Sequence, residues 1–269
     1  MLRTKLVAVD LDGTLLTGER TLAPGGVRSL RQAVHQGVYV VLSTTRNPGG
    51  TRLFCREIGT DAPMICTNGA QVWGSPEGPV WVCHTIPRKV ALTVAQLADA
   101  RGWELSTTVG AMTYWRQRPG QSLGPYRPRV TVVARNVDAI VGDPVRILVW
   151  HPEAVSVIRS LCTAQFADQC YTTTYHHSDG TVESLSISAP QADKGTALRL
   201  VLERLEIAPE QAVAIGDNAN DIPMFEVAGT SIAMGNALPA IQSQADAVAP
   251  DHDDEGVAWA VQRFVLEPP

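Results

Sequence analysis

Two carboxylates, Asp10 and Asp12, stand two residues apart directly after an apolar run, Leu6 to Val9. Carboxylates this close repel each other unless a cation, a raised pKa or a solvated turn accommodates their charge. A further pair, Asp217 and Asp221, follows another apolar run near the C-terminus. If the fold brings the two pairs together, the residue types alone predict a site that needs a cation.

The other polar residues at such positions suggest which reaction the site performs. Oxygen ligands with no neighbouring His or Cys favour a hard ion, most simply Mg²⁺. Lys194 begins a helix-like segment, and its ammonium can neutralise phosphate oxygens. Thr44 and Thr45 follow another apolar run and offer hydroxyl and N–H groups to an anion. Together these groups predict a phosphoryl-transfer site, in which one aspartate attacks phosphorus and another handles protons.

The apolar runs that must position these residues are short, β-branched and continuous, which is typical of strands in a parallel sheet covered on both faces. They are LVAV (6–9), VYVVL (38–42), PMIC (63–66), AVAI (212–215) and SIAM (231–234). Helix-like segments at 24–36 and 194–205 lie between them. This alternation predicts an α/β fold, a doubly wound, Rossmann-like parallel sheet with its ligand site outside the carboxyl ends of the strands.

The middle of the chain has a different pattern. Runs such as RILVW (146–150) and SLSIS (184–188) alternate apolar and polar residues, which is typical of an antiparallel sheet solvated on one face. We therefore predict a catalytic core formed by residues 1–81 and 189–269. Residues 82–188 are predicted to form an inserted α+β domain.

Composition excludes several classes of partner. The 269 residues are 45% hydrophobic and carry a net charge of −5, so a concentrated basic face for nucleic acid is not expected. No apolar run approaches the about 20 residues needed to span a bilayer. Asp10 and Asp12 interrupt the N-terminal apolar run too early for a signal peptide, so we expect a cytoplasmic protein. The five cysteines form no CxxC pair and are interpreted as small buried hydrophobes. The oligomeric state is not predicted.

The ordered motifs resemble those of a known family. DLDGTLL (10–16) resembles the first signature of the haloacid dehalogenase (HAD) superfamily, and a strand ending in STTR, then Lys194, then GDNANDIPMF follow in that superfamily's order. Finer marks are similar to its Cof-type branch, whose cap domain lies between the second and third motifs. These marks are CTNGA (66–70), AMGNA (233–237), ADAV (245–248) and DDEGVAWAV (253–261).

The resemblance implies a role for each acidic residue. Asp10 would be the nucleophile. Asp12 would protonate the leaving alkoxide and then deprotonate water, while its backbone carbonyl joins Asp10 and Asp217 as a ligand of Mg²⁺. Asp221 would orient either a metal-bound water or Lys194.

The resemblance also implies a set of phosphate ligands. These would be Thr44, Lys194 and Asn220, helped by the backbone at Leu11 and Thr45. The family usually has glycine where this chain has Thr45, so a side chain there either narrows the phosphate pocket or adds a donor.

Three neighbouring features are interpreted without a catalytic role. Arg46 is expected to solvate a helix end. Asn68 is expected to serve as a turn residue, because Asn-Gly favours tight turns. The acidic run DHDDE (251–255) is expected to be a solvated loop and helix start.

These observations lead to one main hypothesis and two alternatives. The protein is predicted to be a Mg²⁺-dependent phosphatase that hydrolyses small phosphorylated metabolites through an aspartyl-phosphate, with sugar phosphates first and phosphorylated cofactors second. A phosphomutase or phosphotransferase of the same superfamily would instead pass the phosphoryl group to a sugar hydroxyl. A non-catalytic sensor would bind the phosphorylated ligand without turnover.

Overall fold

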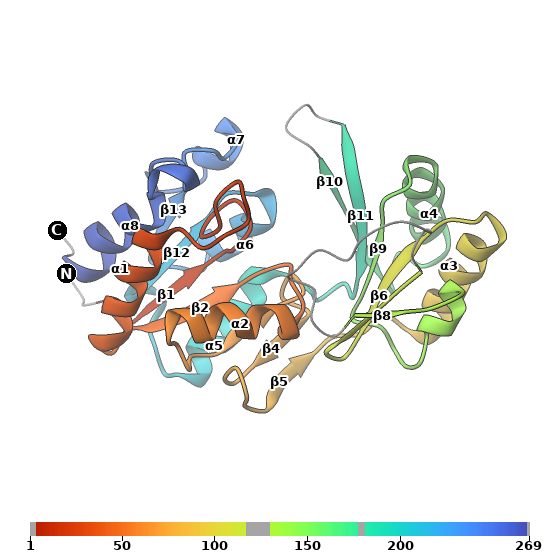
Figure 1. Ribbon diagram of the computed structural model, residues 1–269, viewed down its shortest axis with the longest axis horizontal. Helices are drawn as coiled ribbons and strands as arrows, with labels where there is room; N and C mark the ends of the chain where they lie inside the picture. The colour runs from red at the N-terminus through yellow and green to blue at the C-terminus, as the bar shows by residue number, and fades with distance from the viewer. Residues whose placement is uncertain (1–3, 117–129, 177–180, 268–269) are drawn as a thin grey trace. The chain divides into compact units, whose positions relative to one another are not determined.

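A computed structural model describes residues 4–116, 130–176 and 181–267 (Figure 1). The chain forms two compact units. Unit 1 comprises Met1–Val82 and Asp193–Pro269, and unit 2 comprises Cys83–Ala192. Each unit contains its own β-sheet and its own apolar clusters. That unit 2 acts as a cap remains a prediction.

The sheet of unit 1 has β1 near its centre, with strands added on both sides. Its order is β14 (Ala247–Val248), β13 (Thr230–Ala233), β12 (Ala212–Gly216), β1 (Leu6–Val9), β2 (Tyr39–Ser43), β3 (Met64–Cys66), β4 (Gln71–Trp73) and β5 (Val80–Cys83). Neighbours from β14 through β3 pair in parallel, whereas β4 runs antiparallel to β3. The predicted α/β fold with a doubly wound parallel sheet is thus confirmed, with an antiparallel extension at one edge.

Strand β1 shows why the apolar runs are continuous. Val7 and Val9 belong to one apolar cluster, and Leu6 and Ala8 belong to the other. Side chains of α1 (Pro24–His35), α2 (Pro48–Ile58) and α8 (Gly256–Val261) complete the first cluster, and those of α5 (Lys194–Arg204) and α6 (Ile222–Phe225) contribute to the second. The short helix α7 (Pro239–Gln242) follows β13. Successive side chains point to opposite faces, so burial of both faces requires apolar residues at every position.

Unit 2 is an α+β unit with a mainly antiparallel sheet. Its order is β10 (Tyr171–His176), β11 (Val182–Ser188), β9 (Arg146–Val149), β6 (Leu105–Val109), β7 (Met112–Trp115) and β8 (Val130–Val132). Helices α3 (Arg88–Ala100) and α4 (Pro152–Gln165) supply residues to its core, together with Leu185 and Ile187 of β11. Ser184, Ser186 and Ser188 alternate with these two residues and therefore face the other side of the sheet.

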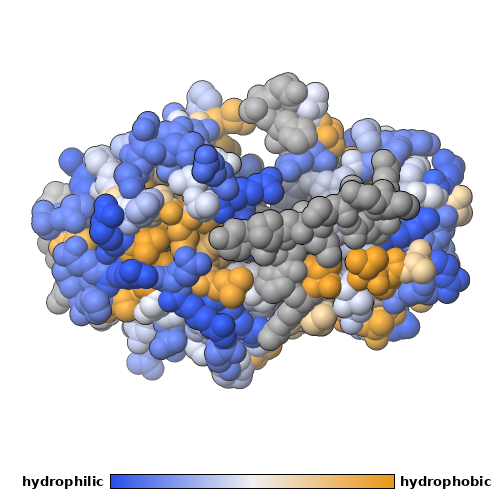
Figure 2. Space-filling view, viewed as in Figure 1, coloured by the Kyte–Doolittle hydropathy of each residue, from blue (hydrophilic) through white to orange (hydrophobic). Residues whose placement is uncertain are grey.

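The surface of each unit is mostly polar on the face drawn in Figure 2. On this face in Figure 2, hydrophilic side chains predominate on the described parts of each unit, with patches of hydrophobic side chains among them. Four of the cysteines are buried, as predicted, whereas Cys83 is exposed. In the part of the chain that the structure describes, no helix combines the length and the apolar character needed to cross a membrane.

Candidate active site

The turn after β1 places the first motif at the carboxyl edge of the sheet. The carbonyl of Leu11 accepts hydrogen bonds from Thr14 N at 3.3 Å and from Leu16 N at 2.8 Å. Gly13 has a φ of 81°, and a Cβ added there would overlap the Asp217 carboxylate. Glycine therefore serves two needs, a left-handed conformation and a close approach between the loops that follow β1 and β12.

Lys194 reaches this edge from the start of α5. Asp193 caps that helix by accepting a hydrogen bond from Thr196 N at 2.7 Å. The Lys194 side chain is fully buried, and its Nζ lies 2.7 Å from Asp10 Oδ1 and 2.5 Å from Asp221 Oδ1. Burial alone would lower the pKa of Lys194, but the two carboxylates outweigh it and raise that pKa above its ordinary value. The ammonium is therefore a fixed positive charge within the site.

Asp221 organises the loop after β12 as well as Lys194. Its Oδ2 accepts hydrogen bonds from the backbone N–H groups of Asp217 and Asn218, both at 3.0 Å. Its Oδ1 accepts the bond from Lys194. With both oxygens used by protein donors, Asp221 lies where it can orient Lys194, one of the two alternatives that the resemblance implies.

The carboxylates gather closely enough to hold a cation. One oxygen each from Asp10, Asp217 and Asp221 lies within 4.8 Å of the others. Burial raises the pKa of Asp10 well above its ordinary value, although Lys194 opposes the rise. Burial, helped by the charge of Asp221, also raises the pKa of Asp217 to about 7. Two buried carboxylates and one half-buried one, Asp217, face one ammonium. Their ligand atoms are all oxygen, so a hard divalent ion fits this site.

The predicted phosphate ligands lie at the ends of β2 and β12. Thr44 is buried, its N–H donates to Ile65 O at 2.9 Å, and its carbonyl accepts from Asn68 N at 3.0 Å. Asn68 in turn accepts a hydrogen bond from Asn220 Nδ2 at 2.8 Å. Asn68 thus links two predicted ligands, a role that its interpretation as a turn residue missed. Thr45 is half-buried in the turn that follows β2.

Asp12 points to a different partner from Asp10. Arg46 donates from Nε to Asp12 Oδ2 at 2.7 Å and from a terminal nitrogen to Oδ1 at 2.5 Å. The guanidinium also lies 5.1 Å from the centre of the Phe54 ring. The expectation that Arg46 only solvates a helix end missed this two-point contact. Its position two residues after Thr44, at the same edge of the sheet, was the available signal.

Fold and site together are those of a phosphoryl-transferring α/β hydrolase, and comparison with known proteins identifies the family. The sequence model described as haloacid dehalogenase-like hydrolase matches residues 7–261, and the chain belongs to this family. The resemblance read from the motifs is therefore confirmed.

Two named phosphatases are similar to this protein along nearly the whole chain. The phosphatase YwpJ of Bacillus subtilis is 28% identical over 97% of this chain and all of its own. The pyridoxal phosphate phosphatase YbhA of Escherichia coli is 28% identical over 98% of this chain and 99% of its own. The solved structure of a haloacid dehalogenase-like hydrolase from B. subtilis aligns with a TM-score of 0.81 at 26% identity, covering 97% of this chain and 100% of that one.

Proposed function

We propose that the protein is a Mg²⁺-dependent phosphatase that hydrolyses small phosphorylated metabolites, sugar phosphates first and phosphorylated cofactors second. The observation that carries the proposal is the buried Lys194 ammonium, held between Asp10 and Asp221 at the carboxyl edge of the parallel sheet. This arrangement places a nucleophilic carboxylate, that of Asp10, next to a fixed positive charge, as phosphoryl transfer requires. Hydrolysis of phosphoric monoesters is also the activity that the names of both relatives describe.

The chain's own residues account for both halves of the reaction. With one oxygen bound by Lys194, Asp10 attacks phosphorus with the other, and the bond from phosphorus to the ester oxygen breaks. Asp12 donates its proton to the departing oxygen. Asp12 then removes a proton from water, and the resulting hydroxide attacks the aspartyl-phosphate, which releases inorganic phosphate and regenerates Asp10. Arg46 orients the ionised Asp12 carboxylate through two contacts, and one of these contacts opens when that oxygen of Asp12 carries the proton.

The remaining residues bind the metal ion and the phosphate group of the substrate. Asp10 and Asp217, with the backbone carbonyl of Asp12, would hold Mg²⁺. The bound ion would neutralise the carboxylates and stabilise negative charge on the phosphoryl oxygens. Phosphate is bound by Lys194 and by a set of hydroxyl, amide and backbone donors. That set consists of Thr44, Asn220 and the backbone at Leu11 and Thr45.

In this proposal unit 2 acts as the cap and determines which class of substrate is accepted. The face of its sheet opposite the apolar core carries Ser184, Ser186 and Ser188, with Arg146 opposite Ser188 in the neighbouring strand. All three serines are buried in this structure, and such a row of hydroxyl groups would hydrogen-bond a polyhydroxylated ligand enclosed there. The pyridoxal phosphate phosphatase among the relatives supports cofactors as the second class. The predicted cytoplasmic location belongs to the same proposal.

The first experiment is release of inorganic phosphate from sugar phosphates, phosphorylated cofactors and nucleotides, with Mg²⁺ and with EDTA. We expect Mg²⁺-dependent release that Asp10→Asn abolishes while the fold is retained. Asp61→Asn, the same change at an exposed position, is the matched control and should leave release unchanged.

Three outcomes would contradict the proposal. Release that persists in Asp10→Asn would refute the nucleophile assignment. An isomerised sugar phosphate in place of free phosphate would favour the mutase. Tight binding of a sugar phosphate by the folded protein, without turnover in saturating Mg²⁺, would favour the sensor.

A further inference from the structure

The acidic run DHDDE (251–255) does more than the solvated loop predicted from the sequence. Its side chains contact the segment Leu16–Gly26, which connects the first motif to helix α1. We call Asp251–Glu255 the anchoring run. It lies in the same unit as the site, more than 200 residues along the chain from the segment it holds.

His252 is the member of the anchoring run whose side chain contacts the turn Leu11–Leu16, which we call the catalytic turn. Its Nδ1 lies 2.7 Å from the carbonyl oxygen of Leu16. A carbonyl only accepts hydrogen bonds, so Nδ1 carries the proton. The N–H of Leu16 in turn donates to the carbonyl of Leu11, the residue between Asp10 and Asp12, at 2.8 Å. Two hydrogen bonds therefore connect the imidazole to the backbone between the two proposed catalytic aspartates.

A second connection runs through Asn236. The backbone N–H of His252 donates to Asn236 Oδ1 at 3.1 Å, and Asn236 Nδ2 donates to the carbonyl of Gly13 at 2.9 Å. The catalytic turn is thus held at two points, Gly13 and Leu16, by hydrogen bonds that lead to His252.

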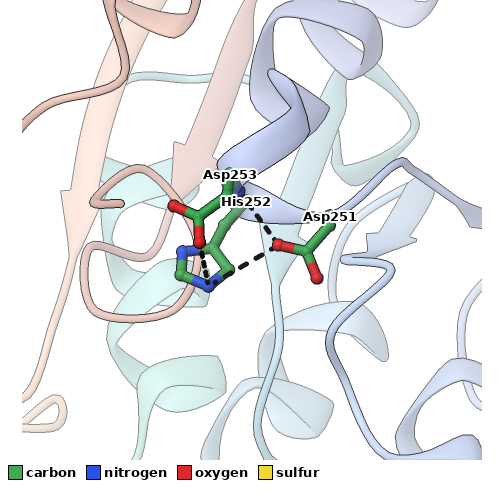
Figure 3. A group of neighbouring side chains, drawn as sticks. All are labelled: Asp251, His252 and Asp253. Carbon is green, nitrogen blue, oxygen red and sulfur yellow. Dashed lines mark hydrogen bonds and ion pairs between the residues drawn. The ribbon is translucent and has the colours of Figure 1, made fainter. Parts of the chain in front are cut away.

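The two aspartates that flank His252 lie beside its ring. Figure 3 shows both carboxylates directed at Nε2, which lies 3.6 Å from an oxygen of Asp251 and 3.8 Å from one of Asp253. Asp253 also accepts a hydrogen bond from Gly18 N at 2.9 Å, and Asp251 accepts one from Asp253 N at 2.9 Å. Both carboxylates already serve backbone donors, so we assign this cluster to holding the segment and not to binding a metal ion.

Glu255 fixes the far end of the segment. Its carboxylate accepts hydrogen bonds from Gly25 N at 2.8 Å and Gly26 N at 3.0 Å, at the start of α1, where Ala23 provides no side-chain cap. A Cβ on Gly25 would overlap that carboxylate. Glu255 itself has a φ of 57°, in the left-handed region that non-glycine residues rarely adopt. The close approach at Gly25 and the left-handed backbone at Glu255 together bring this carboxylate onto the two N–H groups.

We propose that His252 is a positioning residue for the catalytic turn, in a run that Asp253 and Glu255 tie to the segment Leu16–Gly26. This inference rests on the proposed phosphatase function. By fixing the Leu16 carbonyl, His252 fixes the turn from Leu11 to Leu16 and so the direction in which Asp12 presents its carboxylate.

The test compares two replacements of His252. His252→Leu puts a methyl group where Nδ1 was, whereas His252→Asn restores an N–H donor at that position. For an alkyl phosphate we expect His252→Leu to lower kcat about 10- to 100-fold with KM changed less than about twofold, because misplacing a catalytic group by about 1 Å can cost that much. His252→Asn should recover most of the loss. Asp254→Asn removes an exposed charge from the same run and should leave kcat unchanged.

Two further readouts separate positioning from general damage. With p-nitrophenyl phosphate, whose leaving group needs no proton, the first-turnover rate of His252→Leu should fall less than with an alkyl phosphate. Backbone hydrogen exchange over residues 11–18 should be faster in His252→Leu than in the natural protein and in His252→Asn.

Each result decides between the two proposals. Natural kcat in a folded His252→Leu, or no recovery in His252→Asn, would overturn the role of His252. If the natural protein releases no phosphate from any substrate, the phosphatase proposal fails by itself. Hydrogen exchange then still tests the positioning role, which unchanged exchange in His252→Leu would refute.

Discussion

At the scale of residues, the structure gives different surroundings to Asp10 and Asp12, which lie only two residues apart in the sequence. Asp10 is almost fully buried against Lys194, whereas the Asp12 side chain is 44% exposed and pairs with Arg46. A nucleophile needs a fixed, desolvated environment, and an acid–base residue must exchange protons with substrate and water. The partners on either side of Leu11 therefore match two different tasks.

Arg46 provides a test of the second task. Arg46→Lys keeps the charge but loses the two-point contact with Asp12, because an ammonium cannot match both carboxylate oxygens. We expect kcat to fall about tenfold with a smaller change in KM. Steady-state kinetics would measure this, with Arg56→Lys as the control, since Arg56 pairs with Glu77 in an exposed ion pair. Equal kcat in the two variants would contradict a role for the contact.

Lys194 tests the buried ion cluster. Lys194→Met keeps much of the side-chain volume but leaves Asp10 and Asp221 without their cation. Removing one partner of a buried ion pair typically costs about 3–5 kcal/mol, so we expect a loss of that order in the free energy of unfolding together with loss of activity. Urea denaturation without divalent ions would measure it. Adding Asp221→Asn should restore part of the stability but no activity, and a fully stable Lys194→Met would contradict this account.

At the scale of elements, the ends of strands and the starts of helices place the reactive groups. Helix α5 begins at Lys194 because Asp193 caps it, so the same turn that ends the loop also delivers the ammonium. The loop after β12 is closed by the Asp221 carboxylate on two backbone N–H groups. Capping and the proposed catalysis thus use the same short segments.

The cap of α5 gives a prediction at this scale. Asp193→Ala should lower the free energy of unfolding by about 1 kcal/mol and also lower kcat, because the first turn of α5 carries Lys194. Asp246→Ala is the control: Asp246 accepts a hydrogen bond from Ser231 N at 2.8 Å in another part of unit 1. It should cost comparable stability and leave kcat unchanged. A natural kcat in Asp193→Ala would show that the cap does not position Lys194.

At the scale of the whole molecule, each of the two units has its own apolar core. Cys55 and Cys66 lie in unit 1, and Cys162 lies in the core of unit 2. Burial raises the pKa of the Cys66 thiol to about 12, so at pH 8 very little of it is the reactive thiolate. These thiols can therefore report the opening of each unit separately.

Alkylation at pH 8 tests whether the units open independently. In the natural protein the exposed Cys83 should react first. Ile158→Ala, in α4, should cost about 2–5 kcal/mol and speed labelling of Cys162 while leaving Cys55 and Cys66 unchanged. Ile58→Ala, in α2, is the matched change in unit 1 and should do the reverse. Mass spectrometry of the labelled peptides would read this, and parallel acceleration in both units would show a single cooperative core.

The sequence by itself determined the fold class and which strand ends carry polar groups. Burial on both faces of β1 demands a continuous apolar run, and parallel strands bring their carboxyl ends to one edge, so the convergence of Asp10, Asp217 and Asp221 could be predicted. The antiparallel β4 and the pairing of Asp12 with Arg46 could not. A charged or amide side chain next to a strand end looks the same in sequence whether it is solvated or paired. Only the tertiary structure decided that Arg46 meets Asp12, that Asn68 meets Asn220, and that the anchoring run meets a segment at the opposite end of the chain, because these contacts depend on how distant loops pack.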